Sequence, residues 1–228
     1  MIGDIFPKID RRRTSKMEIN KSYYTRFSEY TFISPEWKNR WALIVSGVLS
    51  PLSIAIAAVA VAGYAINNES ALSWIALYIA LSILPPTLYI MYLVRKGIVT
   101  DFHLNVREER TKPFILMTVN TALVFLVMLL LGAPKLILIV IATAVLQLFF
   151  MLLITLKWKI SGHCTAVTGL VVLALALFGE NLLPLTLLIP LVAWSRVRLK
   201  RHTLSQTVAG AFMGGVIVST LLYFTNIL

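Results

Sequence analysis

The three histidines of this chain each lie in a short polar segment that is rich in lysine and arginine. His103 lies in "TDFHLNVREERTK", His163 in "KWKISGHC" and His202 at the end of "SRVRLKRH". An imidazole can act as a nucleophile, a general acid or a general base, and guanidinium groups bind phosphate oxygens in pairs. Ionisable groups beside long apolar segments indicate a functional site, if the fold brings the three segments to one place.

The middle segment has the features of an anion-binding turn. Ser161 and Gly162 directly precede a long apolar run, so we expect them at a helix N-terminus, where free backbone N–H groups attract anions. Gly162 would let the backbone approach a ligand closely, and His163 would face the same space. An N-cap serine with a turn glycine explains the same residues without a ligand. Lys157 and Lys159 are interpreted as markers of the membrane face rather than as ligand contacts.

The third segment requires a break between two helices. Arg196 and His202 are six residues apart, which would place them about 120° apart around one continuous helix. We therefore expect Arg196 to end one apolar helix and His202 to open the next. Taken alone, this segment is better explained as a basic stop signal between two membrane spans.

The first segment predicts a helical face. His103, Arg107 and Arg110 stand at positions i, i+4 and i+7, which share one side of an α-helix. Such a face would present two guanidinium groups to one phosphate.

The second and third segments resemble the type 2 phosphatidic acid phosphatase (PAP2) superfamily, which includes lipid phosphatases and vanadium haloperoxidases. The third motif of that superfamily, S-R-x5-H, is complete as Ser195, Arg196 and His202. The second motif, P-S-G-H, is present over residues 160–163 with isoleucine in place of proline. The resemblance covers roughly residues 95–215.

The first motif of the superfamily, K-x6-R-P, is degenerate in this chain. In one register Arg110 takes the arginine place, with Thr111 instead of proline and His103 at the lysine place. In the other register Lys112 precedes the proline, and Asn105 stands at the lysine place. We favour the first register, because it agrees with the helical face described above.

The resemblance implies a membrane lipid phosphatase that works through a phosphohistidine intermediate, without a metal or another cofactor. In that mechanism His202 attacks phosphorus, and His163 protonates the leaving oxygen and then activates water. Relatives often carry an aspartate four residues after the last histidine, where this chain has Gln206, which could hold the ring by a hydrogen bond. The groups expected to bind the phosphate oxygens are Arg107, Arg110, Ser161, the Gly162 N–H and Arg196.

Other interpretations stay open. Three histidines could bind zinc and leave one position for water. Cys164 could act as a nucleophile, although a small buried cysteine is the better interpretation. A protein of the same fold could also bind or transport an anionic lipid without turnover, or pass the phosphoryl group to an acceptor. Phosphatidate-like and polyprenyl phosphate or diphosphate substrates fit equally well.

The composition places these segments in a membrane protein. Hydrophobic residues make up 58% of the 228-residue chain, and charged residues make up 14%, where a soluble domain has about 25%. Several apolar runs approach the roughly 20 residues needed to cross a bilayer. We predict an all-α, polytopic transmembrane helical bundle of about six to seven spans, and the resemblance adds a core like that of PAP2 enzymes and haloperoxidases.

Apolar runs between polar breaks give seven candidate spans. Pro51 interrupts the first run, and Pro85 and Pro86 interrupt the second; prolines in membrane helices indicate kinks more often than ends. The fifth and sixth runs are short, so a shallow hairpin is an alternative to two full crossings. The seven runs are 41–66, 71–94, 114–132, 135–156, 164–179, 182–194 and 203–226.

The polar connections alternate between basic and non-basic. Every lysine and arginine except Lys135, 20 of 21, lies in the N-terminal segment or in the three histidine-containing connections. Positive residues near span ends favour the cytoplasm, so the N-terminus and the active site are predicted on the cytoplasmic face of the cell membrane. Two apolar runs separate successive histidine segments, and all three segments therefore return to the same face.

The chain divides into a basic juxtamembrane segment, residues 1–40, and a single transmembrane phosphatase domain, residues 41–228. Cations that flank membrane spans explain the net charge of +11 without nucleic acid, so membrane lipids and a lipid phosphate are the expected partners. Gly210 and Gly214 have the small-xxx-small spacing that lets the last helix pack closely against another. Homodimerisation through this pair is not indicated, and no oligomeric state is predicted.

Overall fold

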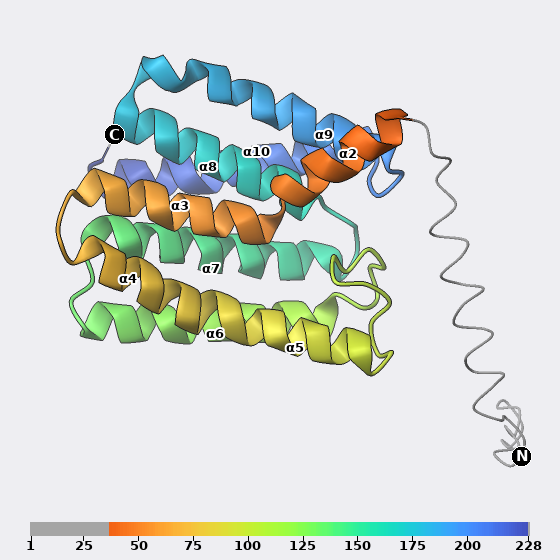
Figure 1. Ribbon diagram of the computed structural model, residues 1–228, viewed down its shortest axis with the longest axis horizontal. Coiled ribbons are helices and arrows are strands. Elements are labelled where there is room, and N and C mark those ends of the chain that lie inside the picture. Colours follow the sequence, from red (N-terminus) through yellow and green to blue (C-terminus); the bar gives the residue numbers. More distant parts are fainter. Residues whose placement is uncertain (1–36, 228) are drawn as a thin grey trace, which may run out of the picture.

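The computed structural model describes residues 37–227, which form a bundle of antiparallel helices and contain no β-strand (Figure 1). The basic segment predicted over residues 1–40 lies, up to residue 36, outside the described residues. The elements are α2 (Trp37–Val48), α3 (Pro51–Ile66), α4 (Ala71–Tyr78), the π-helical turn η1 (Ile79–Ile83), α5 (Leu84–Arg95), α6 (Thr111–Leu130), α7 (Lys135–Thr155), α8 (Gly162–Phe178), the 3₁₀ helix η2 (Glu180–Leu187), α9 (Leu188–Arg198) and α10 (Leu204–Phe224).

Among residues 37–227, four elements are long and apolar enough to cross a membrane, namely the continuous α4–α5 and the helices α6, α7 and α10. The bent pair α2–α3 meets the same criterion as one broken span, which makes five. The all-helical architecture predicted from the sequence is confirmed. Length and composition alone identify four or five of the six to seven expected spans.

The first apolar run is bent where proline was expected to kink it. Ser50 ends the preceding turn in extended conformation, and its Oγ accepts the N–H of Ser53 at 3.2 Å. Pro51 occupies the first turn of α3, where its missing N–H has no helical partner to lose. As a result, α2 and α3 meet at an angle of 44°.

The two prolines of the second run leave that span continuous. Pro85 has no N–H to donate to the carbonyl of Leu81. Leu81 itself lies inside the π-helical turn η1. The side chain of Asn120 on α6 donates to the Leu81 carbonyl at 3.0 Å, so the freed acceptor is satisfied by a neighbouring helix. This bond also fixes the depth of α6 against α4–α5.

The fifth and sixth runs do not form a shallow hairpin. Figure 1 shows α8 running the length of the bundle and η2–α9 returning beside it. The 3₁₀ helix η2 rises about 2.0 Å per residue, more than an α-helix does. As a result, η2 and α9 together extend about 32 Å with fewer residues than an α-helix of that length needs. Pro184 lies inside the 3₁₀ segment.

Helices α8 and α10 pack more closely than larger residues would allow. A Cβ atom at Gly210 would lie 2.5 Å from the carbonyl oxygen of Ser161, and one at Gly214 would lie 2.2 Å from that of Thr165. Across the same contact, the N–H of Ser161 donates to the carbonyl of Gln206 at 3.2 Å. The close packing predicted from the glycine spacing is confirmed, and α8 is the partner.

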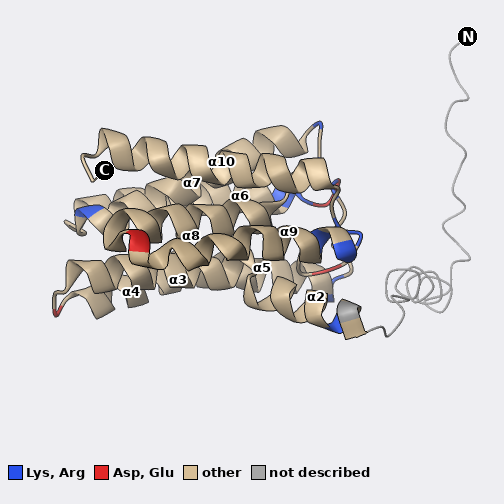
Figure 2. Cartoon of the chain, turned by 90° about the horizontal axis from the view of Figure 1, so that it is seen from above, with Lys and Arg blue, Asp and Glu red and all other residues tan. Residues whose placement is uncertain are grey.

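The connections 96–110, 156–161 and 199–203 all lie at one end of the bundle, as the alternation of the apolar runs predicted (Figure 1). Figure 2 shows lysine and arginine gathered at this end. Lys135 lies at the opposite end, where its ammonium group donates to the carbonyl of Thr225. We call the end with the three connections the basic end.

Replacing Gly214 by alanine should destabilise the bundle, because the added methyl group would meet backbone atoms of Thr165 that cannot rotate away. Overpacking of this kind typically costs about 1–3 kcal/mol. We expect a lower melting temperature of the detergent-solubilised protein, followed by circular dichroism. Gly215→Ala is the matched control, because its Cβ would lie 3.5 Å from Thr168 Cγ2, an ordinary contact. Equal melting temperatures for the two variants would contradict the packing argument.

Candidate functional site

The three basic-end connections meet at the mouth of a cavity of about 510 Å³. The cavity continues from this mouth into the bundle between α3, α5, α7 and α8. Of the residues singled out in the sequence, His103, Arg110, Gly162, His163, Arg196 and His202 line it. All three histidines therefore come together from segments that are far apart in the chain.

His202 lies between α9 and α10 and is held by the first turn of α10. Thr203 and Gln206 form a capping box in which the Thr203 N–H donates to Gln206 Oε1 at 3.2 Å. This bond orients the amide, so the same oxygen accepts the Nδ1–H of His202 at 3.1 Å. The Nε2 atom of His202 consequently carries the lone pair, and Gln206 holds the ring as the sequence suggested.

The surroundings of His202 keep its imidazole neutral. The side chain is only 6% exposed. Burial, followed by the positive charges of Arg196, Lys159 and Arg110, lowers the pKa of His202 to about 3. A neutral imidazole with a free Nε2 lone pair at neutral pH has the protonation state that a nucleophile requires.

His163 is the second residue of α8 and is buried, and its Nε2 has no hydrogen-bond partner among the described residues. Its ring stacks on that of His103, with centroids 6.1 Å apart. His103 itself is exposed at the cavity mouth. A buried polar atom without a partner is costly, so a cavity-lining imidazole of this kind is suited to exchange a proton with a bound ligand.

Arg196 lies in the last turn of α9 and is 1% exposed. Its Nη1 donates to Ser46 Oγ on α2 at 2.6 Å, and its Nη2 donates to Asn105 Oδ1 at 3.5 Å. Within residues 37–227 no carboxylate pairs with it, and its Nε has no partner. A buried guanidinium with only neutral partners is strongly unfavourable unless an anion completes the site.

Ser161 and Gly162, in the turn before α8, have different roles: Ser161 is structural, and Gly162 lies at the cavity. Ser161 is fully buried as the N-cap, and its Oγ accepts the Cys164 N–H at 3.4 Å, as expected for an N-cap serine. Gly162 lines the cavity, whereas Ser161 does not. The N–H groups of Gly162 and His163 donate no hydrogen bond to any part of the chain that the structure describes. These two donors are free for an anion.

The predicted helix over residues 103–110 is wrong, because this segment is a series of turns. The carboxylate of Asp101 accepts the N–H groups of His103 and Asn105 at 2.7 and 3.1 Å. Leu104 between them adopts a left-handed φ of 51°. Such side-chain bonds to the backbone compete with helical hydrogen bonds, so the shared face of His103, Arg107 and Arg110 does not form.

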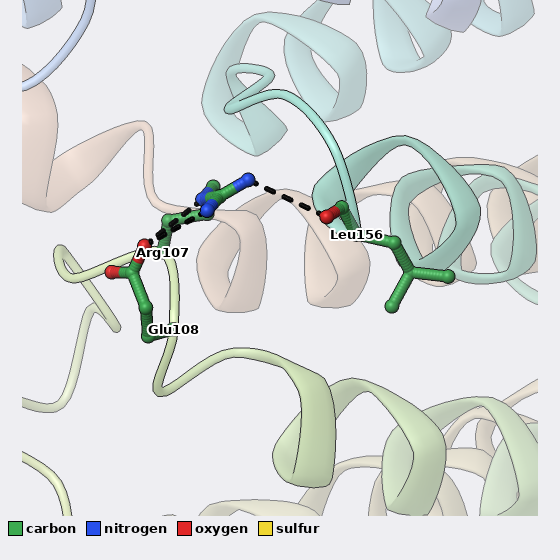
Figure 3. A network of polar contacts seen from close by, with 3 residues as sticks. All are labelled: Arg107, Glu108 and Leu156. Atoms are coloured by element: carbon green, nitrogen blue, oxygen red, sulfur yellow. Dashed lines mark hydrogen bonds and ion pairs between the residues drawn. The ribbon is translucent and has the colours of Figure 1, made fainter. Parts of the chain in front are cut away.

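The two arginines of this segment have different surroundings. Arg107 does not line the cavity, and its Nε donates to Glu108 at 3.1 Å and its Nη1 to the Leu156 carbonyl at 3.4 Å (Figure 3). Arg110 is buried at the cavity, and it donates to the carbonyls of Leu104 and Ile160 at 2.7 and 3.2 Å. Arg110 therefore joins the first connection to the second.

Lys112 lies exposed in the first turn of α6. It does not line the cavity. Of the alternative motif-one residues, the structure thus brings Arg110 and His103 to the cavity and leaves Lys112 outside it.

Two further cations lie near the site, although neither of them lines the cavity. Burial and the charges of Arg110 and Arg196 lower the pKa of Lys159 to about 8, which indicates that this lysine is close to both arginines. Arg201 contributes to the lowered pKa of His103, after burial. The available signal was position, since Lys159 and Arg201 stand next to the second and third motifs.

The alternative zinc site finds no support in the geometry. In the part of the chain that the structure describes, no three His, Cys, Asp or Glu side chains are placed to hold a metal ion. Cys164 is fully buried among apolar side chains that include Val167, Val171 and Val192, the surroundings of a small core residue.

A scan against protein-family models finds no match, and neither curated proteins nor solved structures match this chain significantly. The functional argument accordingly depends on the residues and their geometry.

Replacing Gln206 by glutamate should raise the pKa of His202 well above 3, because a carboxylate beside Nδ1 stabilises the imidazolium form. Glutamate can still accept the Thr203 N–H, so the capping box is kept. Nuclear magnetic resonance titration of histidine-labelled protein in detergent measures the shift.

Ser205→Glu is the control for the Gln206 variant, because it places the same charge on the same exposed turn without a bond to the ring. We expect a clearly smaller rise in the pKa of His202. An equal rise in both variants would show that the hydrogen bond to Gln206 has no special role.

Proposed function

We propose that this chain is an integral membrane phosphatase that hydrolyses a lipid phosphate or diphosphate through a phosphohistidine intermediate. The observation that carries the proposal is the pairing at one cavity of a neutral His202, oriented by Gln206, with a buried Arg196 that lacks a counter-charge. A phosphate group supplies the missing negative charge, and its phosphorus is the electrophile for His202.

In the first step His202 Nε2 donates its lone pair to phosphorus, and the bond from phosphorus to the alcohol oxygen of the lipid breaks. His163, protonated once the bound phosphate offsets the surrounding positive charge, gives a proton to that oxygen, so the lipid alcohol leaves. In the second step neutral His163 takes a proton from water, the oxygen of water attacks the phosphohistidine, and the bond from phosphorus to His202 Nε2 breaks. Inorganic phosphate leaves, and both histidines return to their starting states.

The groups that stabilise the charge on phosphorus surround the cavity mouth. Arg196 and the free N–H groups of Gly162 and His163 are suited to bind the equatorial oxygens, where negative charge develops. Arg110 supplies further positive charge, although two carbonyls already accept two of its five N–H donors. Arg107 is not part of this proposal, because it does not line the cavity.

The assignment of this chain to the PAP2 superfamily, with six to seven spans, belongs to the same proposal. Support comes from the second and third motifs, whose histidines His163 and His202 line one cavity although 39 residues separate them in the sequence. Lys159 and Arg201, close in sequence to these motifs, add positive charge near His202 and His103, although neither of them lines the cavity.

The reaction is tested by phosphate release from a panel of lipid phosphates and diphosphates in detergent. His202→Ala should lower the turnover rate at least about a thousandfold, because no other group takes over the nucleophilic role. Binding of the lipid should persist in this variant. Vanadate, which mimics five-coordinate phosphorus, should inhibit the unmodified protein.

His103→Ala is the matched control, because His103 is exposed at the mouth and only stacks on His163. We expect a much smaller loss of turnover than for His202→Ala. Full activity in His202→Ala, or equal losses in both variants, would sink the proposed mechanism.

We also propose that the basic end faces the cytoplasm. Support comes from the distribution of lysine and arginine in the described residues. These cations gather at the basic end, whereas Lys135 lies at the opposite end (Figure 2). In a Cys164→Ala background, Glu108→Cys should stay unlabelled by a membrane-impermeant maleimide in intact cells. Asn68→Cys, in the opposite connection, should be labelled. Strong labelling of Glu108→Cys in intact cells would reverse the orientation.

A further inference from the structure

The cavity contains a second polar feature, well below the cations. Thr121 on α6 and Thr143 and Gln147 on α7 line it among residues that are mostly apolar. We call these three residues the polar trio. None of their side chains makes a hydrogen bond to any residue between 37 and 227.

Some threonines of these spans bond their hydroxyl groups to the backbone of the same helix, although that of Thr155 on α7 has no partner among the described residues. Thr118, one turn before Thr121 on α6, donates to the carbonyl of Phe114 at 2.7 Å. Thr87 on α5 likewise donates to the carbonyl of Ile83 at 2.7 Å. Thr121 and Thr143 do not use this common solution, so their hydroxyl groups remain available to whatever fills the cavity.

Gln147 is the only amide side chain in α7, and Thr143 is the only other polar residue in the middle of this helix. An amide without a hydrogen-bond partner in an apolar medium costs several kcal/mol, on the order of 2–7. A Cβ at Gly169 on α8 would lie 2.8 Å from Gln147 Nε2, so the absence of a side chain at Gly169 makes room for the amide. The site is therefore shaped to hold a polar group at this depth.

The polar trio lies at one depth. Helices α6 and α7 form an antiparallel pair joined by residues 131–134, which places Thr121 level with Thr143 and within about a turn of Gln147. Gly169 follows Gly162 by seven residues on α8, so Gln147 lies about 10 Å below the free N–H groups at the cavity mouth. Met151, which lies against Gly162, occupies the wall between the two levels.

We propose that the polar trio donates hydrogen bonds to the ester carbonyls of an acylglycerol phosphate whose phosphate lies at the cavity mouth. This inference rests on the proposed function and narrows its substrate class. The ester groups of such a lipid lie only a few bonds from phosphorus, and the donors of the trio match their acceptor oxygens. A polyprenyl phosphate has hydrocarbon at the same depth and would leave the trio unpaired, which a site built for hydrogen bonds discriminates against.

The test compares the full-length protein with the triple variant Thr121→Val, Thr143→Val and Gln147→Met, which keeps side-chain size and removes the hydrogen bonds. The measured quantity is the kcat/KM for a diacylglycerol phosphate divided by that for a polyprenyl phosphate of similar chain length in the same detergent. We expect the unmodified protein to prefer the acylglycerol phosphate, and the triple variant to lose about tenfold or more of this preference.

Thr118→Val is the matched control, because it removes a hydroxyl from the same helix outside the cavity. Thr118→Val should leave the substrate preference unchanged. Thr121→Ser, which keeps a hydroxyl group, should retain most of the preference. An unmodified protein without preference, or a triple variant with an unchanged one, would overturn the inference.

Binding of non-hydrolysable phosphonate analogues of both lipids separates this inference from the proposed function. Tighter binding of the acylglycerol phosphonate, lost in the triple variant, supports the trio even if no phosphate is released from any lipid. Phosphate release at equal rates from both lipids, with equal binding of both analogues, supports the phosphatase and overturns the role of the trio.

Discussion

The contact between the backbones of α8 and α10 is the constraint on which the site depends. Gly210 and Gly214 allow the carbonyls of Ser161 and Thr165 to lie where side chains would otherwise be. The Ser161 N–H then reaches the carbonyl of Gln206, so the first turns of the two helices are joined directly. His163 follows Ser161 by two residues, and His202 is bonded to the side chain of Gln206. The helix starts that position the two histidines are therefore joined by backbone, which has far less freedom than packed side chains.

The second determinant is positive charge that the protein itself does not neutralise. Arg196 is bonded to a serine and an asparagine, and Arg110 to two carbonyls, so neutral dipoles replace the carboxylates that buried arginines usually pair with. Asp101 is close by, but its oxygens accept hydrogen bonds from the first connection. A bound anion would remove much of this unfavourable energy, and an empty site therefore has a stability cost. The same field lowers the pKa of His202, so anion binding and nucleophile protonation are physically coupled.

The sequence predicted the features that follow from spacing over long distances. The six-residue separation of Arg196 and His202 indicated a break between helices, and the glycine pair indicated close packing; α9, α10 and their partner α8 bear out both. The prediction failed where a single side chain determines the backbone conformation. The carboxylate of Asp101 holds residues 103–105 in a loop, although the charge pattern of this segment is typical of a helix. The interpretation of Lys159 as a marker of the membrane face stays a prediction, because this lysine does not line the cavity although it is close to the cationic cluster. The polar trio gave no signal, since single threonines are common in membrane helices and only the cavity shows that their hydroxyl groups lack partners.

The neutral partner of His202 fits this charge environment. A carboxylate at the place of Gln206 would offset the field of Arg196, Lys159 and Arg110, and it would make protonation of the ring easier. The amide fixes the same tautomer without adding negative charge, so the free Nε2 lone pair persists although the imidazolium formed later receives less stabilisation. In the proposed function, the charge of the phosphate is then the main counter-charge of the whole cluster. On this argument, the absence of a carboxylate beside His202 and the gathering of unpaired cations around the cavity are two parts of one electrostatic solution.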